Sequence, residues 1–372
     1  MNAAVSGALL AGLAALRITA PLDAQRPEDR GAFSTGGEVR VLSFDRLPAL
    51  KRLRQIVIPF GAVVSRGPLT VDFGSAWAST ELTRADQSRS SVEHLTDTQL
   101  RGAYTFGRDA VVATVLVNLP TGPRSASALD YSVIGAVSPT FLGYPIAGYA
   151  SGFSVTGGLA GATPVGNWSL GLAGSLRMTS EFTPYVDSAG PVVYKPGLEG
   201  RVRAGADGLV GSSRLTFGLT YSTFGDDQVG LGGGTNRGQY RPGPRWLAEA
   251  GVVAPIGTGT LRASAWYFHR ASGDTAGVSA GNGENLTGAD LAVSIPAGRD
   301  LAIEPVLAGR LSKPAAGEGR MIGAGSGLRI RLSQTVALTP LARYDTGSID
   351  DGGGPKGDLH GWYLSAFVRI SF

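Results

Sequence analysis

The sequence predicts an all-β fold, a transmembrane antiparallel up-and-down β-barrel of about 14 to 16 strands, with 16 favoured. Three observations predict it: apolar and polar residues alternate in strand-like segments, short turns alternate with long loops, and charged residues keep to one face of the segments. No run of about eighteen apolar residues free of charge occurs, so a helical membrane protein is not expected. The expected location is the bacterial outer membrane, with outer-membrane lipid around the barrel.

The final segment, Asp358–Phe372, shows the alternation most clearly. Trp362, Leu364 and Ile370 fall on one face of an extended chain, and Arg369 falls on the other. The segment resembles the C-terminal strand of bacterial outer-membrane β-barrels. That resemblance implies that its last aromatic residue, Phe372, is an assembly signal read by the barrel-assembly machinery.

Short turns and long loops alternate along the chain. The short turns lie at 65–68, 107–108, 166–167, 211–212, 257–259, 298–299 and 333–334. Glycine opens most of them because hairpin turns need positive φ. The long polar connections cover about 82–93, 120–147, 181–195, 226–243, 272–284, 313–320 and 347–357. This asymmetry is typical of outer-membrane barrels, whose short turns face the periplasm.

The N-terminal part leaves two strand counts open. Residues 1–24 are expected to be a signal peptide cleaved after Ala24, and residues 25–37 a mobile N-terminal segment. The barrel is then expected over residues 38–372. Residues 38–66 give 16 strands if they form strands, or 14 if they fold inside as a plug; alternation over Ile56–Val64 favours strands.

The charged residues indicate which side of each strand faces lipid, because Arg or Lys at the bilayer midplane costs roughly 2–4 kcal/mol. Alternate positions that carry charge should therefore point into the lumen. Lipid-facing rows include Leu215 to Tyr221, Leu291 to Ile295 and Leu328 to Leu332. The opposite parity holds the lumen-lining candidates: Asp72, Arg101, Arg177, Arg201, Arg203, Arg214, Glu249, Arg262, Asp290, Glu304, Arg310, Arg329, Arg331, Arg343 and Arg369. The arginines outnumber the acids in this set, so the lumen is expected to carry net positive charge.

Aromatic residues recur near the predicted strand ends, where amphipathic rings favour the lipid–water boundary. They are Trp168, Tyr221, Trp246, Tyr267, Tyr344 and Trp362. An aromatic girdle at each boundary is therefore expected.

Composition argues against several function classes. The net charge is +4, and the basic residues are spread singly rather than in one patch, which argues against nucleic acid. The chain has no Cys, and His94, His269 and His360 show no metal-ligand or triad spacing. We expect neither an enzyme nor a bound metal or cofactor.

The connection over 120–147 is too apolar for a solvated outer loop. Residues 126–137 favour a short helix, and the aromatics that follow favour an inward fold that narrows the barrel mouth or shapes a hydrophobic site. Tyr131, Phe141 and Tyr144 are the constriction-loop candidates.

The motifs VNLPTG (117–122) and LTDTQLRGAYTF (95–106) resemble outer-membrane transporter-like barrels of aromatic-degradation pathways, which are similar to the FadL-type hydrophobic-compound transporters. An N-terminal hatch motif of the FadL type is not visible. The resemblance implies uptake of small hydrophobic or aromatic molecules. We expect a monomeric barrel that lets small-molecule solutes pass passively. The solutes are expected to be hydrophobic, aromatic or anionic. The alternative is a structural or adhesin-like barrel whose lumen is closed by ion pairs.

Overall fold

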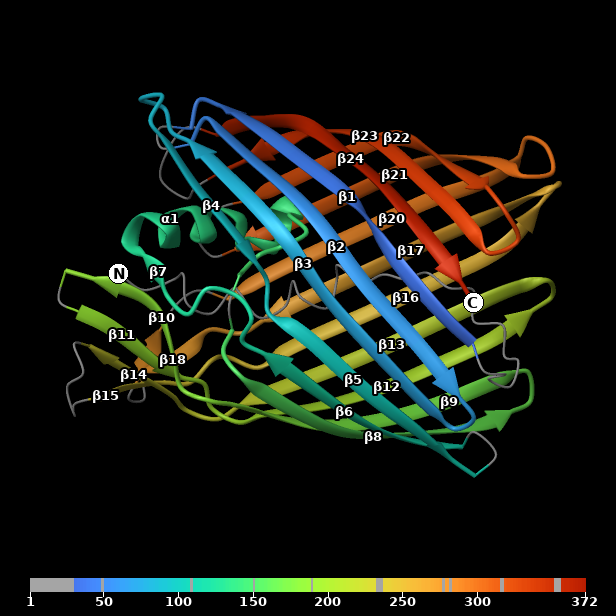
Figure 1. Ribbon diagram of the computed structural model, residues 1–372, viewed down its shortest axis with the longest axis horizontal. Helices are drawn as coiled ribbons and strands as arrows, with labels where there is room; N and C mark the ends of the chain where they lie inside the picture. The colour runs from blue at the N-terminus through green and yellow to red at the C-terminus, as the bar shows by residue number, and fades with distance from the viewer. Residues whose placement is uncertain are drawn as a thin grey trace.

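The computed structural model describes residues 30–47, 50–107, 110–149, 151–188, 190–231, 237–275, 278–280, 283–314, 318–350 and 356–372. Most of these residues form one closed, tilted β-barrel (Figure 1). The predicted signal peptide and its cleavage site lie outside the described residues.

Seventeen strands build the barrel, and two of them, β4 and β5, share one position because both pair with β3. The barrel therefore has sixteen strand positions, as predicted. The strands are β1 (Arg30–Asp45), β2 (Arg52–Arg66), β3 (Leu69–Thr83), β4 (Arg89–Leu95), β5 (Thr98–Phe106), β6 (Val111–Leu119), β8 (Ser154–Val165), β9 (Trp168–Thr179), β12 (Glu199–Val210), β13 (Ser213–Phe224), β16 (Arg245–Ile256), β17 (Gly259–Arg270), β20 (Glu284–Pro296), β21 (Leu301–Pro314), β22 (Gly319–Arg331), β23 (Val336–Ile349) and β24 (Gly357–Ser371).

The barrel closes between its first and last strands. β1 pairs antiparallel with β24, and the backbones of Gly31 and Phe372 exchange hydrogen bonds of 2.7 and 2.9 Å. The plug alternative for residues 38–66 is wrong, because these residues belong to β1 and β2. The predicted mobile segment is also wrong over residues 30–37, which pair with β24. Backbone hydrogen bonding to β24 holds this stretch, whose own side chains carry no apolar alternation.

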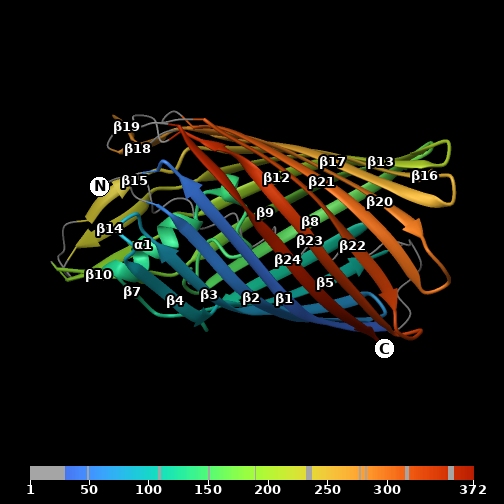
Figure 2. The same ribbon diagram turned by 90° about the horizontal axis from the view of Figure 1, so that it is seen from above.

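The two ends of the barrel differ. The short turns and Phe372 lie at one end, and α1 (Ala128–Val137) with the added short strands lies at the other (Figures 1 and 2). Gly166 and Gly211 both take φ 60°, the positive value that the predicted hairpin turns require. Among the described residues no helix is long and apolar enough to cross a membrane.

The outer connections contain more structure than polar loops would. Five short strands form a separate sheet at the outer end: β7 (Ala126–Ser127), β10 (Phe182–Asp187), β11 (Gly190–Lys195), β14 (Asp227–Leu231) and β15 (Arg237–Tyr240). β18 (Gly273–Thr275) and β19 (Val278–Ala280) make a further hairpin. The expectation of polar loops over 181–195 and 226–243 is thus wrong, because neighbouring connections hydrogen-bond to one another.

The outside of the barrel is apolar and carries pairs of aromatic rings toward its outer end. Phe217, Leu291 and Leu328 are exposed on the predicted lipid-facing parity. Near the outer end, the ring centroids of Tyr221 and Trp246 lie 4.4 Å apart, and a second such pair joins β23 and β24. A closed barrel with this exterior is an outer-membrane protein of the bacterial type.

Candidate functional site

The connection between β6 and β8 folds into the barrel and is held at both ends by one carboxylate. Asp97 lies in the interruption between β4 and β5. It accepts hydrogen bonds from the backbone N–H of Gly122 (3.1 Å) and of Ser151 (2.7 Å), and from Asn118 Nδ2 (3.0 Å). The break in the strand thus supplies the anchor for residues 120–153, which we call the crossing loop.

The crossing loop begins with α1, whose start is fixed by a capping box. Ser127 accepts from the backbone N–H of Asp130, and the Asp130 side chain accepts from that of Ser127. Val133 and Val137 are buried on the inner face of the helix. The predicted helix at 126–137 is therefore present, shifted by two residues at its start.

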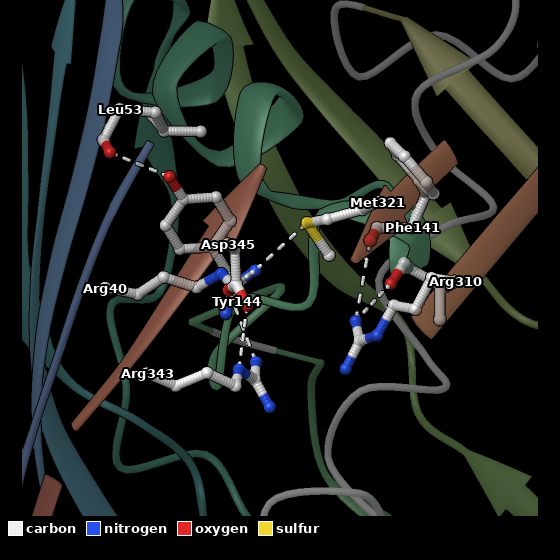
Figure 3. Close-up of polar contacts among 9 residues, drawn as sticks. Arg40, Leu53, Phe141, Tyr144, Arg310, Met321, Arg343 and Asp345 are labelled. Carbon is white, nitrogen blue, oxygen red and sulfur yellow. Dashed lines mark hydrogen bonds and ion pairs between the residues drawn. The ribbon is translucent and has the colours of Figure 1, made fainter. Parts of the chain in front are cut away.

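After α1 the chain spans from the β21 side of the barrel to the β2 side (Figure 3). Arg310 Nη1 donates to the backbone O of Thr140 (3.1 Å), and the ring of Phe141 lies against Gly319 on β22. Tyr144 Oη then donates to the backbone O of Leu53 on β2 (2.7 Å). The loop is therefore tied to two separate parts of the wall, β21 and β2, by charge-assisted and neutral hydrogen bonds.

A second row of hydrogen bonds fixes the returning half of the loop. Gln55 on β2 donates to the backbone O of Ile146 (2.8 Å) and accepts from its N–H (2.9 Å). Tyr149 Oη lies 2.5 Å from Thr80 Oγ1. Burial raises the pKa of Tyr149 to about 12, and it raises the pKa of Tyr144 further, so both phenols stay protonated and can donate.

An apolar cluster fills the space between the crossing loop and the nearby strands. It joins loop residues to inward residues from β1, β2, β3, β4, β17, β20, β22 and β24. Its members include Leu42, Leu53, Val57, Leu82, Val133, Val137, Phe141, Tyr144, Phe268, Leu286 and Leu359. A buried cluster of this size stabilises the loop inside the barrel through removal of apolar area from water.

A buried ion pair lies beneath Tyr144. Arg40 Nη2 is 3.0 Å from Asp345 Oδ2, and each side chain is only 1% exposed. Arg343 Nε donates to the other oxygen of Asp345 (2.8 Å), while the Arg40 guanidinium lies 5.7 Å from the Tyr144 ring centroid (Figure 3). Charges this deeply buried need such pairing to offset their desolvation.

Three carboxylates in the lumen are each shared by two arginines. Glu199 lies 4.0 Å from Arg177 and 2.6 Å from Arg201; Glu304 lies 3.1 Å from Arg262 and 2.8 Å from Arg329; Asp345 lies 3.0 Å from Arg40 and 2.8 Å from Arg343. Each group, which we call a triad, holds two positive charges and one negative charge. The triads lie at different depths, because Arg262 follows a short turn whereas Glu199 opens β12 at the outer end.

Other predicted lumen residues form ion pairs with a single partner, or occupy the alternate strand positions that point inward. Three pairs balance their charges: Arg101 with Asp72 (2.7 Å), Arg203 with Glu249 (2.6 Å) and Arg214 with Asp207 (2.9 Å). Arg331 and Arg369 share the parity of inward residues on β22 and β24, and Asp290 does so on β20.

Sequence reasoning missed several inward charges. Glu38, Arg40, Glu199 and Asp345 are all buried and take part in ion pairs or hydrogen bonds. Parity would have found Asp345, since it is two residues from Arg343. The sequence did not indicate which side of the first strand faces the lumen, so the inward position of Glu38 and Arg40 could not be predicted.

The predicted constriction residues separate into two places. Phe141 and Tyr144 lie in the part of the loop that spans the lumen. Tyr131 instead contacts Tyr185 of the outer sheet, with ring centroids 4.5 Å apart. Only the first two are brought together with the lumen arginines.

The three histidines contact different neighbours. His94 lies beside the Tyr149 ring (centroids 6.4 Å apart), His269 Nδ1 lies 2.7 Å from Asn285 Oδ1, and His360 lies 3.6 Å from Asp45.

No protein-family model and no curated protein matches the chain. Solved structures similar in fold include a TodX monoaromatic hydrocarbon channel mutant (11% identity, TM-score 0.47, covering 93% of this chain and 91% of that one). An outer membrane channel from Pseudomonas putida F1 matches at 11% identity and TM-score 0.41 (95% and 99% covered). The anion-selective porin from Comamonas acidovorans matches at 12% identity and TM-score 0.40 (93% and 100% covered).

The role of Phe372 as an assembly signal stays a prediction. The Phe372 side chain is 70% exposed, so it is accessible at the end of β24. Deleting Phe372 is expected to lower the amount of folded, heat-modifiable protein in the outer membrane, measured by gel shift of membrane fractions. Phe372→Tyr, which keeps an aromatic ring, should preserve insertion. Undiminished insertion of the deletion would count against the signal.

Proposed function

We propose that the barrel is a passive outer-membrane channel for small solutes, with a preference for anions. The observation that carries this proposal is the pair of triads with partly exposed arginines, at Glu199 and at Glu304, each with one positive charge in excess. Fixed charge in a confined space attracts ions of the opposite sign, and arginines lining a pore select anions.

The crossing loop narrows the path in this proposal. Phe141 and Tyr144 are buried in the apolar cluster, which fills the lumen on the β1–β4 and β17–β24 side. Solutes would pass along β6, β8, β9 and β12, whose residues take no part in the buried core of that cluster. The triad at Glu199 lies on this side.

Ion selectivity tests the proposal. Arg329→Gln with Arg331→Gln removes two positive charges and is expected to shift reversal potentials in planar bilayers toward cations. Glu304→Gln leaves Arg262 and Arg329 without their shared carboxylate. This change should shift the reversal potentials toward anions. The proposal requires that the double arginine change and Glu304→Gln shift the reversal potential in opposite directions. Replacing the balanced pair by Arg214→Gln with Asp207→Asn should leave selectivity unchanged.

A closed structural barrel is the second candidate, favoured by the depth of the apolar cluster. Leu53, Val133 and Leu286 each have no exposed surface. A structural barrel would show no conductance with or without the crossing loop. A cation-selective pore, or one that the double arginine change does not affect, would contradict the anion channel.

A further inference from the structure

A cavity of about 210 Å³ lies beside the crossing loop. Loop residues 145–149 form part of its wall, and β6, β8, β9 and β12 contribute further residues. A cavity of roughly 150 Å³ is enough to hold benzene. The space beside the loop can therefore hold one ring with a small substituent.

The cavity lining includes arginines with donors to spare. Arg177 and Arg201 both line it, and their side chains are 18% and 31% exposed. Arg177 Nη1 is 4.0 Å from Glu199, beyond hydrogen-bond length, while its Nε donates to Ser154 Oγ (3.3 Å). Arg201 uses Nη2 to reach Glu199 at 2.6 Å. A guanidinium with a free edge is suited to receive a carboxylate in two parallel hydrogen bonds.

Part of the cavity lining is apolar. Val57 on β2 and Leu116 on β6 line it, together with Pro145 and Ile146 of the crossing loop. These side chains offer no hydrogen bonds, so they favour a hydrocarbon body over a polar one.

Two further acids line the cavity and limit the charge that it accepts. Asp97 is already engaged by Gly122, Ser151 and Asn118, and Glu38 accepts from Tyr363 Oη at 2.5 Å. Neither acid lies within salt-bridge distance of Arg177 or Arg201 in the pairs described. A ligand with a second carboxylate would place it near like charge, which is unfavourable.

We infer that this cavity binds a small organic monocarboxylate whose apolar body is about the size of one ring. The carboxylate lies on Arg177 and Arg201, and the ring lies between Val57, Leu116 and Ile146. This inference rests on the proposed channel function, because it names the solute class for which the site beside the crossing loop is built. The acids at Asp97 and Glu38 make the site select monocarboxylates over dicarboxylates.

Calorimetric titration of the full-length barrel in detergent tests the inference. Benzoate is the probe; benzyl alcohol, which lacks the charge, and terephthalate, which adds a second carboxylate, are the comparison ligands. Benzoate is expected to bind and the other two to bind at least about tenfold more weakly. Arg177→Gln with Arg201→Gln should weaken benzoate binding by about tenfold or more, because the carboxylate loses its charge-assisted hydrogen bonds.

Arg203→Gln is the matched control. Arg203 lies on the same strand and face as Arg201, but it pairs with Glu249 and does not line the cavity. Its loss should leave benzoate affinity unchanged, and heat modifiability shows whether each variant is folded. Equal binding of terephthalate and benzoate, or equal weakening by the control, would overturn the site. If the pore prefers anions but does not bind benzoate, the monocarboxylate site is overturned and the channel proposal stands. Benzoate binding by a pore without anion preference would support the site and overturn the proposed channel preference.

Discussion

Replacing residues 126–142 with a short Gly/Ser linker is expected to raise single-channel conductance several-fold. The replaced segment contains α1 and Phe141, and it carries the contacts from Arg310 that tie the crossing loop to β21. Without it the apolar cluster loses its central members, and the lumen is no longer spanned. Planar-bilayer recording of single channels measures the change directly.

A milder variant loosens the other half of the crossing loop without removing chain. Gln55→Leu keeps the volume of the side chain but loses both hydrogen bonds to Ile146, so the returning half of the loop is less firmly held. We expect brief openings above a largely unchanged baseline. Unchanged conductance in a folded, heat-modifiable linker variant would mean that the crossing loop does not control the path.

Phe217→Arg is expected to lower the free energy of unfolding by roughly 2–4 kcal/mol. Phe217 is 49% exposed on the lipid-facing parity of β13, and its ring stacks on that of Trp168 with centroids 6.1 Å apart. An arginine there would place its charge close to the bilayer midplane. Denaturant unfolding of the barrel in lipid vesicles, followed by tryptophan fluorescence, gives the difference.

Thr216→Arg is the matched control, one residue away. Thr216 lies on the lumen parity, opposite Asp207 on the neighbouring strand. The added charge therefore meets water and a carboxylate rather than lipid, and the loss of stability should be small. Equal losses for the two variants would mean that the assigned facing is wrong.

An all-β barrel with short turns at one end could be predicted from the amino-acid sequence alone, and its alternation favoured sixteen strands over fourteen. These features are local. Alternation has a period of two wherever a strand separates lipid from lumen, and Gly166 or Gly211 marks a turn because only glycine adopts positive φ at little cost.

Which residues meet inside the barrel becomes visible only once the chain is folded. Arg310 and Thr140 are 170 residues apart, and Arg40 reaches Asp345 across the closure of the barrel. The inward fold of residues 120–147 could be predicted from its apolar composition, but its anchor at Asp97 could not. Sharing of one carboxylate by two arginines depends on the stagger of neighbouring strands. Closure of β1 on β24 through backbone hydrogen bonds leaves no pattern in the side chains of residues 30–37.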